Sequence, residues 1–457
     1  MTPLFAEQAL LPDGWARNVR IVVDDAGVIA SVTPHSAPQP SDLNLQSRLL
    51  LPALCNVHSH AFQRAMSGMT EYRSAKHDDF WTWRTLMYRF LDVLTPDHIE
   101  AIAALVYVEM LEAGYAAVGE FHYVHHQPGG RAYDNIAELS ERIFAASQLS
   151  GIGLTHLPVL YSYGGAGKAP LQGGQLRFGN DLEDFTRLFE AAKKAMNHLP
   201  PDSAIGVAPH SLRAMAPQNL KQIASRFKQG PIHIHAAEQV REVEDVQAWL
   251  GARPVEYLLE EVGIDPRWCL IHTTQMNDTE TRGLAQSGAV AGLCPITEAN
   301  LGDGIFNGRE FLAAGGAFAI GSDSNIRISL SEELRQLEYS QRLSHRARNI
   351  MASSDLSTGQ LLYAKASAGG AQALQRNSGA LQVGKWADLV AIDTQDIHLC
   401  GLSQGQLLDG WIFSGNDRLV TDVWSAGRHC VQNGRHRQRD SIAHHYRGVL
   451  RELTNLL

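Results

Sequence analysis

From residue 51 onward, short apolar runs alternate with longer segments in which apolar residues recur at helical spacing. This alternation is typical of repeated βα units, which place parallel strands side by side under a layer of helices. Eight parallel strands are the number that closes a barrel. We therefore expect an α/β fold with a (β/α)8 TIM-type barrel, whose strands lie over residues 51–57, 116–123, 152–160, 204–209, 231–236, 268–272, 289–294 and 317–322.

The segments between these strands predict helices. One is expected over residues 96–113, with Thr95 as the N-cap, Pro96 in the first turn and Gly114 as the stop signal. The same pattern predicts further helices over residues 131–149, 181–198, 216–228, 240–262 and 330–351, and a terminal helix over 439–457.

The two ends of the chain have a different texture. Residues 18–32 predict two short strands joined by a turn at 24–27, and β-rich segments with Gly turns return after about residue 378. Either end alone has too few strands for independent stability. We therefore expect residues 1–50 and 375–457 to pair into one small composite β-sandwich domain, with the barrel over 51–374.

Composition and charge narrow the class of partner. The chain has 457 residues, of which 44% are hydrophobic and 19% charged, as in an ordinary globular protein. Its formal charge is −9 and it has no basic run, which argues against a nucleic-acid partner and favours a small-molecule ligand.

Cysteine usage and apolar runs indicate the compartment. The five cysteines are an odd number with no CxxC spacing, so neither a disulfide framework nor a thiolate zinc site is expected. The N-terminus lacks a basic segment followed by an apolar core, and no apolar run approaches membrane-spanning length. We expect a soluble, cytoplasmic protein without membrane contact.

The ends of the predicted strands carry the candidate chemistry. His58 and His60 close the first strand, and residues two apart in an extended chain project from the same face. His235, His272 and Asp323 close the fifth, sixth and eighth strands. Because the carboxyl ends of barrel strands open onto one face, these side chains should converge. Imidazoles with one carboxylate suit a borderline divalent ion such as Zn²⁺.

Two assignments at the fifth strand follow from position. His233 and His235 share a face, and we assign His235 to the metal because it lies nearer the strand's mouth, whereas His233 sits one layer deeper. Glu238, three residues further on, should lie beside the metal without binding it. A carboxylate in that place can move protons between water and a substrate.

The order of these motifs resembles the amidohydrolase superfamily, in particular its deaminase-like branch with one metal ion. The chain has HxH at His58 and His60, then HxxE from His235 to Glu238, a lone His and an Asp. The run Gly379-Ala-Leu-Gln-Val-Gly-Lys-Trp-Ala-Asp-Leu-Val-Ala-Ile-Asp393 resembles the β domain of that superfamily. Relatives with two metals take a lysine from the fourth strand. Here that strand has none, so the resemblance implies one ion, bound by His58, His60, His235 and Asp323.

Within the superfamily, Cys294-Pro-Ile-Thr-Glu-Ala-Asn-Leu-Gly-Asp-Gly-Ile-Phe306 resembles the segment after strand seven of the formimidoylglutamate deiminases of histidine degradation. Further matching segments are Val57-His-Ser-His-Ala-Phe-Gln-Arg-Ala-Met66, Phe80-Trp-Thr-Trp-Arg84, Glu120-Phe-His-Tyr123 and Ala208-Pro-His-Ser-Leu-Arg213. The resemblance implies hydrolytic deimination of N-formimino-L-glutamate to N-formyl-L-glutamate and ammonia.

This activity implies roles for the pocket residues. A substrate with two carboxylates needs guanidinium partners, and the resemblance suggests Arg84 and Arg213. It also suggests Gln63, Tyr123 and His210 as substrate contacts. We expect Glu238 to protonate the imino nitrogen, His272 to steady the tetrahedral centre, and Asp323 to accept a proton from water as well as bind the metal.

Alternatives remain open at this stage. The chain could be a deaminase or chlorohydrolase acting on a purine or triazine ring, or a scaffold that has kept the fold without the chemistry. The donor set suits Zn²⁺ best but also Fe²⁺. The resemblance implies a homodimer. His122, His125 and His126 lack a compact carboxylate or thiolate partner, so we expect them to be structural.

Overall fold

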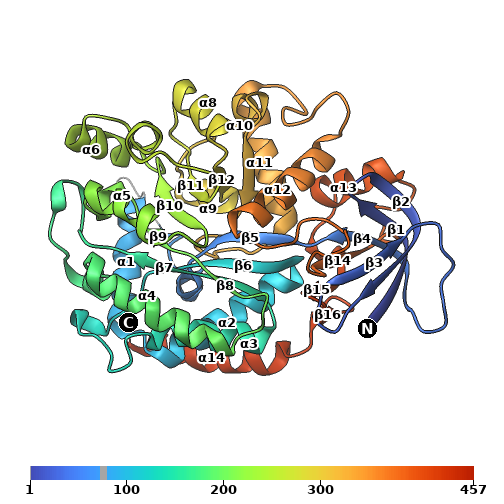
Figure 1. Ribbon diagram of the computed structural model, residues 1–457, viewed down its shortest axis with the longest axis horizontal. Coiled ribbons are helices and arrows are strands. Elements are labelled where there is room, and N and C mark those ends of the chain that lie inside the picture. Colours follow the sequence, from blue (N-terminus) through green and yellow to red (C-terminus); the bar gives the residue numbers. More distant parts are fainter. Residues whose placement is uncertain (1, 73–79, 457) are drawn as a thin grey trace.

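The computed structural model describes residues 2–72 and 80–456 (Figure 1). Parallel strands and their covering helices form the larger part of the molecule, and a sheet made from both chain ends lies at one side of it. In Figure 1 the helices α8, α10, α11 and α12 lie above the parallel strands, and α2, α3, α4 and α14 lie below them.

The parallel strands form two sheets with sequential neighbours. The first has the order β5-β6-β7-β8, with β9 also pairing with β7, and the second has the order β10-β11-β12-β13. The bounds are β5 Leu54–Ser59, β6 Tyr115–His122, β7 Gly153–Leu160, β8 Ala204–Ile205, β9 Ala208–Pro209, β10 Ile232–Ala236, β11 Trp268–His272, β12 Val290–Leu293 and β13 Ala317–Ile320.

The two parallel sheets touch at both of their edges. Parallel bridges join Val207 to Ile232 and Ser211 to His235 at one junction. At the other junction a bridge joins Ser59 to Asp323, where the Asp323 N–H donates to the His58 carbonyl over 2.9 Å. The carboxyl ends of β5, β10, β11 and β13 therefore come to one end of the paired sheets.

The predicted fourth strand, 204–209, is interrupted. Gly206 separates β8 from β9 because the chain passes very close to the next strand: a Cβ at Gly206 would lie 2.4 Å from the Pro231 carbonyl oxygen. The first predicted strand, 51–57, is also shifted, since residues 51 and 52 belong to β4 (Leu43–Pro52) and the parallel strand begins at Leu54.

The helix expected over 96–113 is present as α2 (Pro96–Glu112), and the Thr95 side chain accepts the His98 N–H over 3.3 Å. The helix expected over 240–262 is broken into α6 (Val240–Leu250) and α7 (Pro254–Tyr257), followed by a π-turn, because Gly251 adopts a left-handed φ of 76° and Pro254 starts a new helix.

The remaining helices of this part cover the parallel strands. Their bounds are α1 Phe80–Val93, α3 Glu138–Ser150, α4 Leu182–Ala195, α5 Pro217–Arg226, α8 Asp278–Ser287, α9 Pro295–Leu301, α10 Gly308–Ala313, α11 Leu330–His345 and α12 Thr358–Ala373. The α1, α8, α9, α10 and α12 helices were not predicted.

Strands from both chain ends form one eight-stranded sheet, which we call the end sheet. Its order is β17-β16-β15-β14-β4-β1-β2-β3, so the contact between the two ends is the pairing of β4 with β14. The bounds are β1 Thr2–Leu11, β2 Gly14–Val23, β3 Ile29–Thr33, β14 Leu389–Asp393, β15 Val420–Ser425, β16 Arg428–Gln432 and β17 Arg435–His436, with α13 at Gln404–Phe413.

The terminal helix α14 (Arg439–Leu456) leaves the end sheet and packs on α2, as Figure 1 shows. Its first residue, Arg439, forms ion pairs with Glu112 at 3.2 Å and with Glu109 at 3.5 Å. The eighteen residues of this helix therefore hold the C-terminal part of the chain against the helices that cover the parallel strands.

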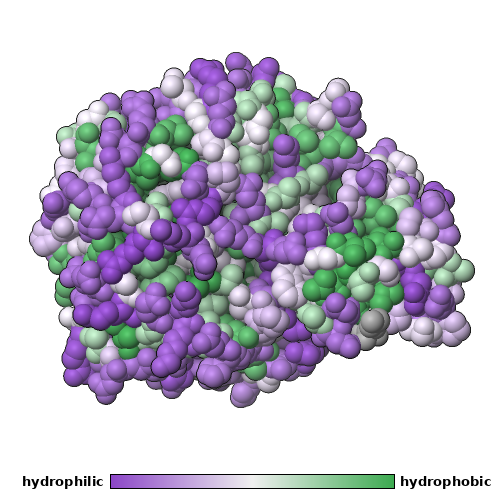
Figure 2. Space-filling model, in the orientation of Figure 1, coloured by the Kyte–Doolittle hydropathy of each residue, from purple (hydrophilic) through white to green (hydrophobic). Residues whose placement is uncertain are grey.

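Hydrophilic residues cover most of the face seen in Figure 2, and the largest apolar area of that view lies over the end sheet. Across residues 2–72 and 80–456, the structure has no helix of the length and apolarity needed to cross a membrane.

Candidate metal centre and active site

Four side chains from strand ends far apart in the sequence meet at the carboxyl ends of the parallel strands. The Nε2 atom of His58 lies 3.1 Å from that of His60 and 3.1 Å from that of His235. The Asp323 Oδ1 atom lies 3.4 Å from the His58 Nε2 and 3.3 Å from the His60 Nε2. Ligands on a tetrahedral ion with bonds of about 2.0–2.1 Å are separated by about 3.3 Å. These four separations therefore fit one zinc-sized cation.

The hydrogen bonds behind two of the histidines fix where their lone pairs point. The His60 Nδ1–H donates to the Phe121 carbonyl over 2.9 Å, and the His235 Nδ1–H donates to the His210 carbonyl over 3.0 Å. A neutral ring that donates through Nδ1 carries its lone pair on Nε2. Both lone pairs face the single Nε2 of His58, which can offer a proton to one of them at most. A cation among the three nitrogens satisfies all of them.

Protonation of the rings could also satisfy the facing nitrogens, but the pKa values of these histidines are too low for it near pH 7. Burial lowers the pKa of His58 and of His235 well below the usual 6.5, and neighbouring histidines lower both further. Burial also lowers the pKa of His60. The rings are therefore neutral near pH 7, which is the form that binds a metal.

His272 lies beside this group and is a second geometric choice of ligand. One atom from each of His58, His235, His272 and Asp323 lies within 4.8 Å of the others. The His272 ring is held by carboxylates instead: its Nδ1 lies 3.3 Å from the Glu298 Oε1, and its Nε2 lies 3.8 Å from the Glu238 Oε1. The His60 Nε2 lies 3.1 Å from the His58 Nε2 and 3.3 Å from the Asp323 Oδ1 and has no carboxylate on its other nitrogen, so it fits the fourth ligand position better.

His233, the other histidine of β10, points away from this centre. Its Nε2–H donates to the Ala373 carbonyl over 2.8 Å, and its side chain is fully buried. The structure therefore brings only His235 from this strand to the donor group, among the residues that it describes.

Glu238 and His272 form an unusual buried pair. Burial raises the pKa of Glu238 to about 7. Burial alone would lower the pKa of His272, but the charges of Glu238, Asp323 and Glu298 and the hydrogen bond from Glu298 raise it to about 10. A carboxyl group that changes charge near neutrality is suited to proton transfer, and an imidazolium beside it can stabilise negative charge.

The backbone at these strand ends is strained. Ala237, His272 and Asp323 have left-handed φ angles of 53°, 71° and 46°, a region that non-glycine residues enter at a cost of about 1–3 kcal/mol each. The turns place the side chains of Glu238, His272 and Asp323 over the end of the strands instead of letting the chain continue outward.

Two buried asparagine side chains join β5 to the loop that follows β13. The Asn325 Nδ2 donates to the Ser59 Oγ over 3.2 Å, and its Oδ1 accepts the Ser322 hydroxyl over 2.6 Å. Asn56 donates to the same Ser322 hydroxyl over 2.6 Å, and its Oδ1 accepts the Ser322 N–H over 3.1 Å. This network of hydrogen bonds fixes the position of Asp323 relative to His58 and His60.

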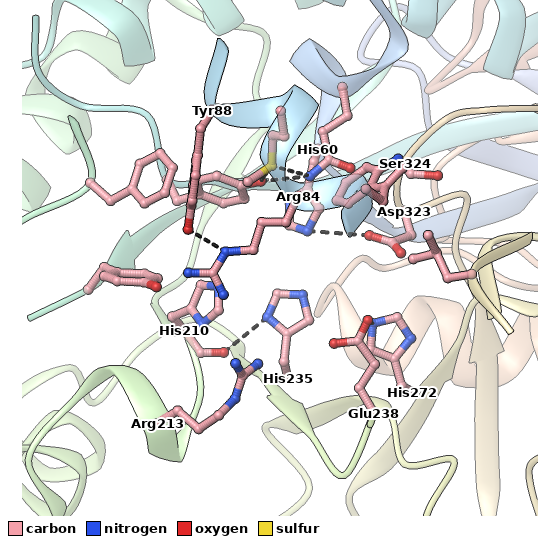
Figure 3. A pocket seen from close by; sticks show the side chains of 17 residues that line it. His60, Arg84, Tyr88, His210, Arg213, His235, Glu238, His272, Asp323 and Ser324 are labelled. Carbon is pink, nitrogen blue, oxygen red and sulfur yellow. Dashed lines mark hydrogen bonds and ion pairs between the residues drawn. The ribbon is translucent and has the colours of Figure 1, made fainter. Parts of the chain in front are cut away.

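A pocket of about 620 Å³ opens over this centre (Figure 3). All five residues predicted to contact the substrate line it, and within it the Gln63 amide donates to the Tyr123 hydroxyl over 2.7 Å. The five predicted contacts are Gln63, Arg84, Tyr123, His210 and Arg213. The lining also includes five of the residues discussed above, namely His60, His235, Glu238, His272 and Asp323.

Charges in the pocket are separated. In Figure 3 the guanidinium groups of Arg84 and Arg213 lie near His210 on one side, whereas Glu238, His272 and Asp323 lie on the other. The Arg84 Nε donates to the Tyr88 hydroxyl, which holds the guanidinium within the pocket. The arrangement provides cations for anionic groups at one end of a ligand and proton-transfer groups at the other.

Comparison with known proteins identifies the family. Residues 49–430 match the Amidohydrolase family, and residues 1–45 match "Formimidoylglutamate deiminase HutF, N-terminal domain". The chain belongs to the amidohydrolase family. Over 99% of its length and 100% of the relative's, this amidohydrolase is 48% identical to a protein of Pseudomonas aeruginosa named formimidoylglutamate deiminase.

One solved structure supports the same family, and a more distant one shares the fold. An amidohydrolase from Brucella melitensis superposes with a TM-score of 0.95 at 48% identity, covering 99% of this chain and 100% of that one. Atrazine chlorohydrolase TrzN from Arthrobacter aurescens TC1, complexed with zinc, superposes with a TM-score of 0.84 at 19% identity, covering 98% and 100%. The second likeness indicates a shared fold alone.

Several pocket residues of this amidohydrolase were not predicted from the sequence. Tyr88 lies one helical turn after Arg84 on α1, and that spacing was the only signal for it. Burial raises the pKa of Tyr88 to about 12, so it stays a neutral hydrogen-bonding group. The remaining unpredicted lining residues are Trp83, Met87, Tyr161, Phe178, Leu301 and Ser324.

The three histidines expected to be structural are buried away from the pocket. The His125 Nε2–H donates to the Val159 carbonyl over 2.9 Å, and the His126 Nε2–H donates to the Gly179 carbonyl over 2.9 Å. Burial lowers the pKa of His122 and of His125 well below 6.5. Their contacts are those of core residues of this amidohydrolase.

Proposed function

We propose that this amidohydrolase is a formimidoylglutamate deiminase, which hydrolyses N-formimino-L-glutamate to N-formyl-L-glutamate and ammonia in histidine degradation. The observation that carries the proposal is the separation of charge in the pocket, with Arg84 and Arg213 facing one end and Glu238, His272 and Asp323 the other. The substrate has a matching polarity, because its amidine forms one end of the molecule and both carboxylates belong to the glutamate part, with the γ-carboxylate at the far end. The name of the Pseudomonas aeruginosa relative supports the same substrate.

We assign the divalent ion to His58, His60, His235 and Asp323. Three imidazole nitrogens and one carboxylate oxygen at tetrahedral separations favour Zn²⁺, with Fe²⁺ as the alternative. The segment of the fourth strand, Ala204–Ile205 and Ala208–Pro209, offers no lysine, which supports one ion. When bound, the ion supplies Lewis acidity that lowers the pKa of water toward neutrality.

Residues of the chain account for the proton movements. Hydrolysis of HN=CH–NH–R by one water molecule forms a C–O bond, breaks the bond to the imino nitrogen and moves both water protons to that nitrogen, which leaves as ammonia. Asp323 accepts the first proton as the oxygen attacks the amidine carbon. Glu238 carries a proton to the imino nitrogen, and His272, 3.8 Å from Glu238, stabilises negative charge on the tetrahedral centre.

The substrate is oriented by the other side of the pocket. Arg84 and Arg213 bind the two carboxylates, and Gln63, Tyr123 and His210 hold the chain between the carboxylates and the amidine. His210 is well placed for this, because its ring lies 4.9 Å from that of the His235 ligand and 4.5 Å from that of Tyr161. It therefore spans the distance between the two ends of the pocket.

We extend the proposal to the architecture. The two parallel sheets touch at both edges, which supports one eight-stranded (β/α)8 barrel with the site at its carboxyl face. The end sheet supports a composite β-sandwich domain of residues 1–50 and 375–457 beside a barrel domain of 51–374. We also expect a homodimer, which light scattering of the purified protein would measure.

Ammonia release tests the function. The purified protein should release ammonia from N-formimino-L-glutamate much faster than from N-formimino-L-aspartate, guanine or adenosine. Preference for guanine, adenosine or a triazine would refute the proposal in favour of a ring deaminase or chlorohydrolase. A protein without stoichiometric metal and without activity on any of these compounds would be a scaffold.

Two arginine variants test the binding of carboxylates. Arg84→Met and Arg213→Met should each raise KM for the dicarboxylate by about 10- to 100-fold, because a charge-assisted hydrogen bond contributes about 1.5–3 kcal/mol. The exposed Arg131, which bonds to Gln127 outside the pocket, provides the matched control. Equal KM values for Arg131→Met and the two pocket variants would refute the assignment.

A further inference from the structure

None of the residues given a role in the proposed reaction lies in the segment from Cys294 to Asp303, which contains α9. It follows β12 and brings two buried carboxyl groups, Glu298 and Asp303, to the side of the site that holds Glu238 and His272. Side chains of Glu298 and Asp303 retain only 5% and 6% exposure, and a carboxyl group is rarely buried to that extent without a partner that needs it.

Glu298 has a defined partner in His272. Its Oε1 accepts the Cys294 N–H over 2.8 Å and lies 3.3 Å from the His272 Nδ1. The backbone bond fixes the carboxylate, and the carboxylate fixes the imidazole with its proton on Nδ1. The His272 Nε2 is thereby directed toward Glu238.

Asp303 is anchored from two directions. Its N–H donates to the Glu298 carbonyl over 2.9 Å, its carbonyl accepts the Gln275 amide, and its Oδ1 accepts the Gln239 amide. Gln239 directly follows Glu238, so Asp303 is tied to the loop that carries the proton-transfer carboxyl. These bonds leave the second carboxyl oxygen of Asp303 available.

The Asp303 Oδ2 is buried and has no hydrogen-bond partner among the residues that the structure describes. One donor atom from each of Glu238, His272 and Asp303 lies within 4.8 Å of the other two. Two carboxyl groups this close in a buried place do not both ionise, because each charge opposes the other.

The carboxyl groups of Asp303 and Glu238 differ in how readily they lose a proton. Burial, followed by the charge of Glu238, raises the pKa of Asp303 to about 9, whereas Glu238 titrates near 7. Asp303 is therefore the group that keeps its proton. The O–H of a protonated Asp303 would have an acceptor in Glu238, since one carboxyl oxygen of each residue lies within 4.8 Å of the other.

We propose that the Cys294–Asp303 segment is a positioning element of the active site, in which Asp303, as a carboxylic acid, donates to Glu238 while Glu298 orients His272. The inference rests on the proposed deiminase function. Asp303 acts through Glu238 and does not touch the substrate, so its loss should reduce turnover more than substrate binding.

Two substitutions of Asp303 test the state of its carboxyl group. Asp303→Ala removes the donor, and we expect kcat to fall at least about tenfold with KM changed less than threefold, since a positioned acid–base group contributes about 10²–10⁴ to the rate. Asp303→Asn keeps an acceptor for Gln239 and an N–H donor for Glu238, so it should recover most of that loss. Equal damage by Asn and Ala would overturn the proposal, because it would require an ionised Asp303.

Comparing Tm with kcat distinguishes a positioning role of Asp303 from a purely structural one. Asp417 is a matched control, because its Oδ1 accepts the Ser331 N–H over 3.1 Å far from the pocket. Asp417→Ala should lower the Tm as Asp303→Ala does but leave kcat near that of the wild type. A selective loss of kcat in Asp303→Ala supports the proposal, and a Tm loss without a kcat loss overturns it.

The metal content of each variant tests a competing assignment. We expect one equivalent of zinc in the wild type and in Asp303→Ala. A second equivalent that disappears in Asp303→Ala would make Glu238, His272 and Asp303 a second metal site and would overturn the proposal. Absence of ammonia release by the wild type refutes the deiminase function itself, and is thus distinct from these outcomes.

Discussion

The joint between the end sheet and the parallel strands depends on one buried guanidinium. The Arg376 Nε donates to Asp388 over 2.6 Å, and its terminal nitrogens donate to the Asp388 Oδ1 over 2.9 Å, the Asp202 Oδ2 over 2.9 Å and the Asp202 carbonyl over 2.7 Å. Asp202 precedes β8, whereas Asp388 precedes β14 of the end sheet. Arg376→Met would keep the volume and leave two buried carboxylates without this partner.

The expected loss of stability in Arg376→Met depends on the hydrogen bonds that Asp202 and Asp388 keep. Removing one member of a buried ion pair costs about 3–5 kcal/mol, because the other charge stays buried. Asp202 keeps a two-point pair with Arg428 at 2.7 Å, and Asp388 keeps the Ala426 N–H at 2.7 Å, so we expect the lower end, about 3 kcal/mol. An unfolding entropy of about 2.1 cal/mol/K per residue over 457 residues converts this to about 3 °C in Tm.

The effect of Arg376→Met on the free energy of unfolding should also depend on pH. Burial raises the pKa of Asp202, but hydrogen bonds and charges of Arg428 and Arg376 lower it below the usual 3.8. A depressed carboxyl pKa stabilises the folded state above the unfolded pKa, and this contribution is lost as pH falls through the folded pKa. The difference in unfolding free energy between wild type and Arg376→Met should be complete at pH 7 and shrink below about pH 4.

Urea unfolding at several pH values measures both effects. The control is Arg142→Met, which removes exposed pairs with Asp97, Glu100 and Glu138 and should cost under about 1 kcal/mol. A destabilisation by Arg376→Met no larger than that of Arg142→Met, or one independent of pH down to pH 3, would refute the reasoning.

Three further predictions concern the site. Glu238→Gln should bind zinc normally yet lose about 10²–10⁴ in kcat, and a near-normal rate of ammonia release would contradict its role in proton transfer. Removing the ion with a chelator should abolish activity and lower the Tm, and zinc at 100 times its Kd should restore about 2.7 kcal/mol, as measured by thermal unfolding with added metal. Asn325→Ala, which breaks the bond to Ser59, should weaken zinc binding about 10- to 100-fold in competition with a chromophoric chelator, whereas unchanged affinity would show that the amide network does not position Asp323.

Periodicity predicted the elements that bury a regular face. The parallel strands and the helix from Pro96 are present with small shifts, because period-two and helical apolar patterns directly reflect burial. β1 was missed, since pairing with β2 along its length and with β4 between Leu4 and Ala9 decides its conformation. The break at Gly206 was missed because it depends on Pro231, a contact between strands that no local pattern contains.

The sequence could also predict the four proposed metal ligands, for a related reason. HxH spacing and the rule that parallel strands end at one face are enough to bring His58, His60, His235 and Asp323 together. Glu298 and Asp303 were beyond reach, because each acts through a second side chain, His272 or Glu238, and a carboxyl group in a loop is by default an exposed one.

Strain at the strand ends links the fold to the chemistry. A left-handed turn at His272 or Asp323 costs about 1–3 kcal/mol and persists only where other bonds determine the conformation. Those bonds are present: the Thr273 N–H donates to the Ala236 carbonyl over 3.0 Å, and the Asp323 carbonyl accepts the His60 N–H over 2.9 Å. Each joins neighbouring strand ends, so the pairing that builds the sheets also holds the donor atoms at separations that fit a cation. The geometry of the site is therefore set by the backbone of adjacent strands, which are more rigid supports than loops.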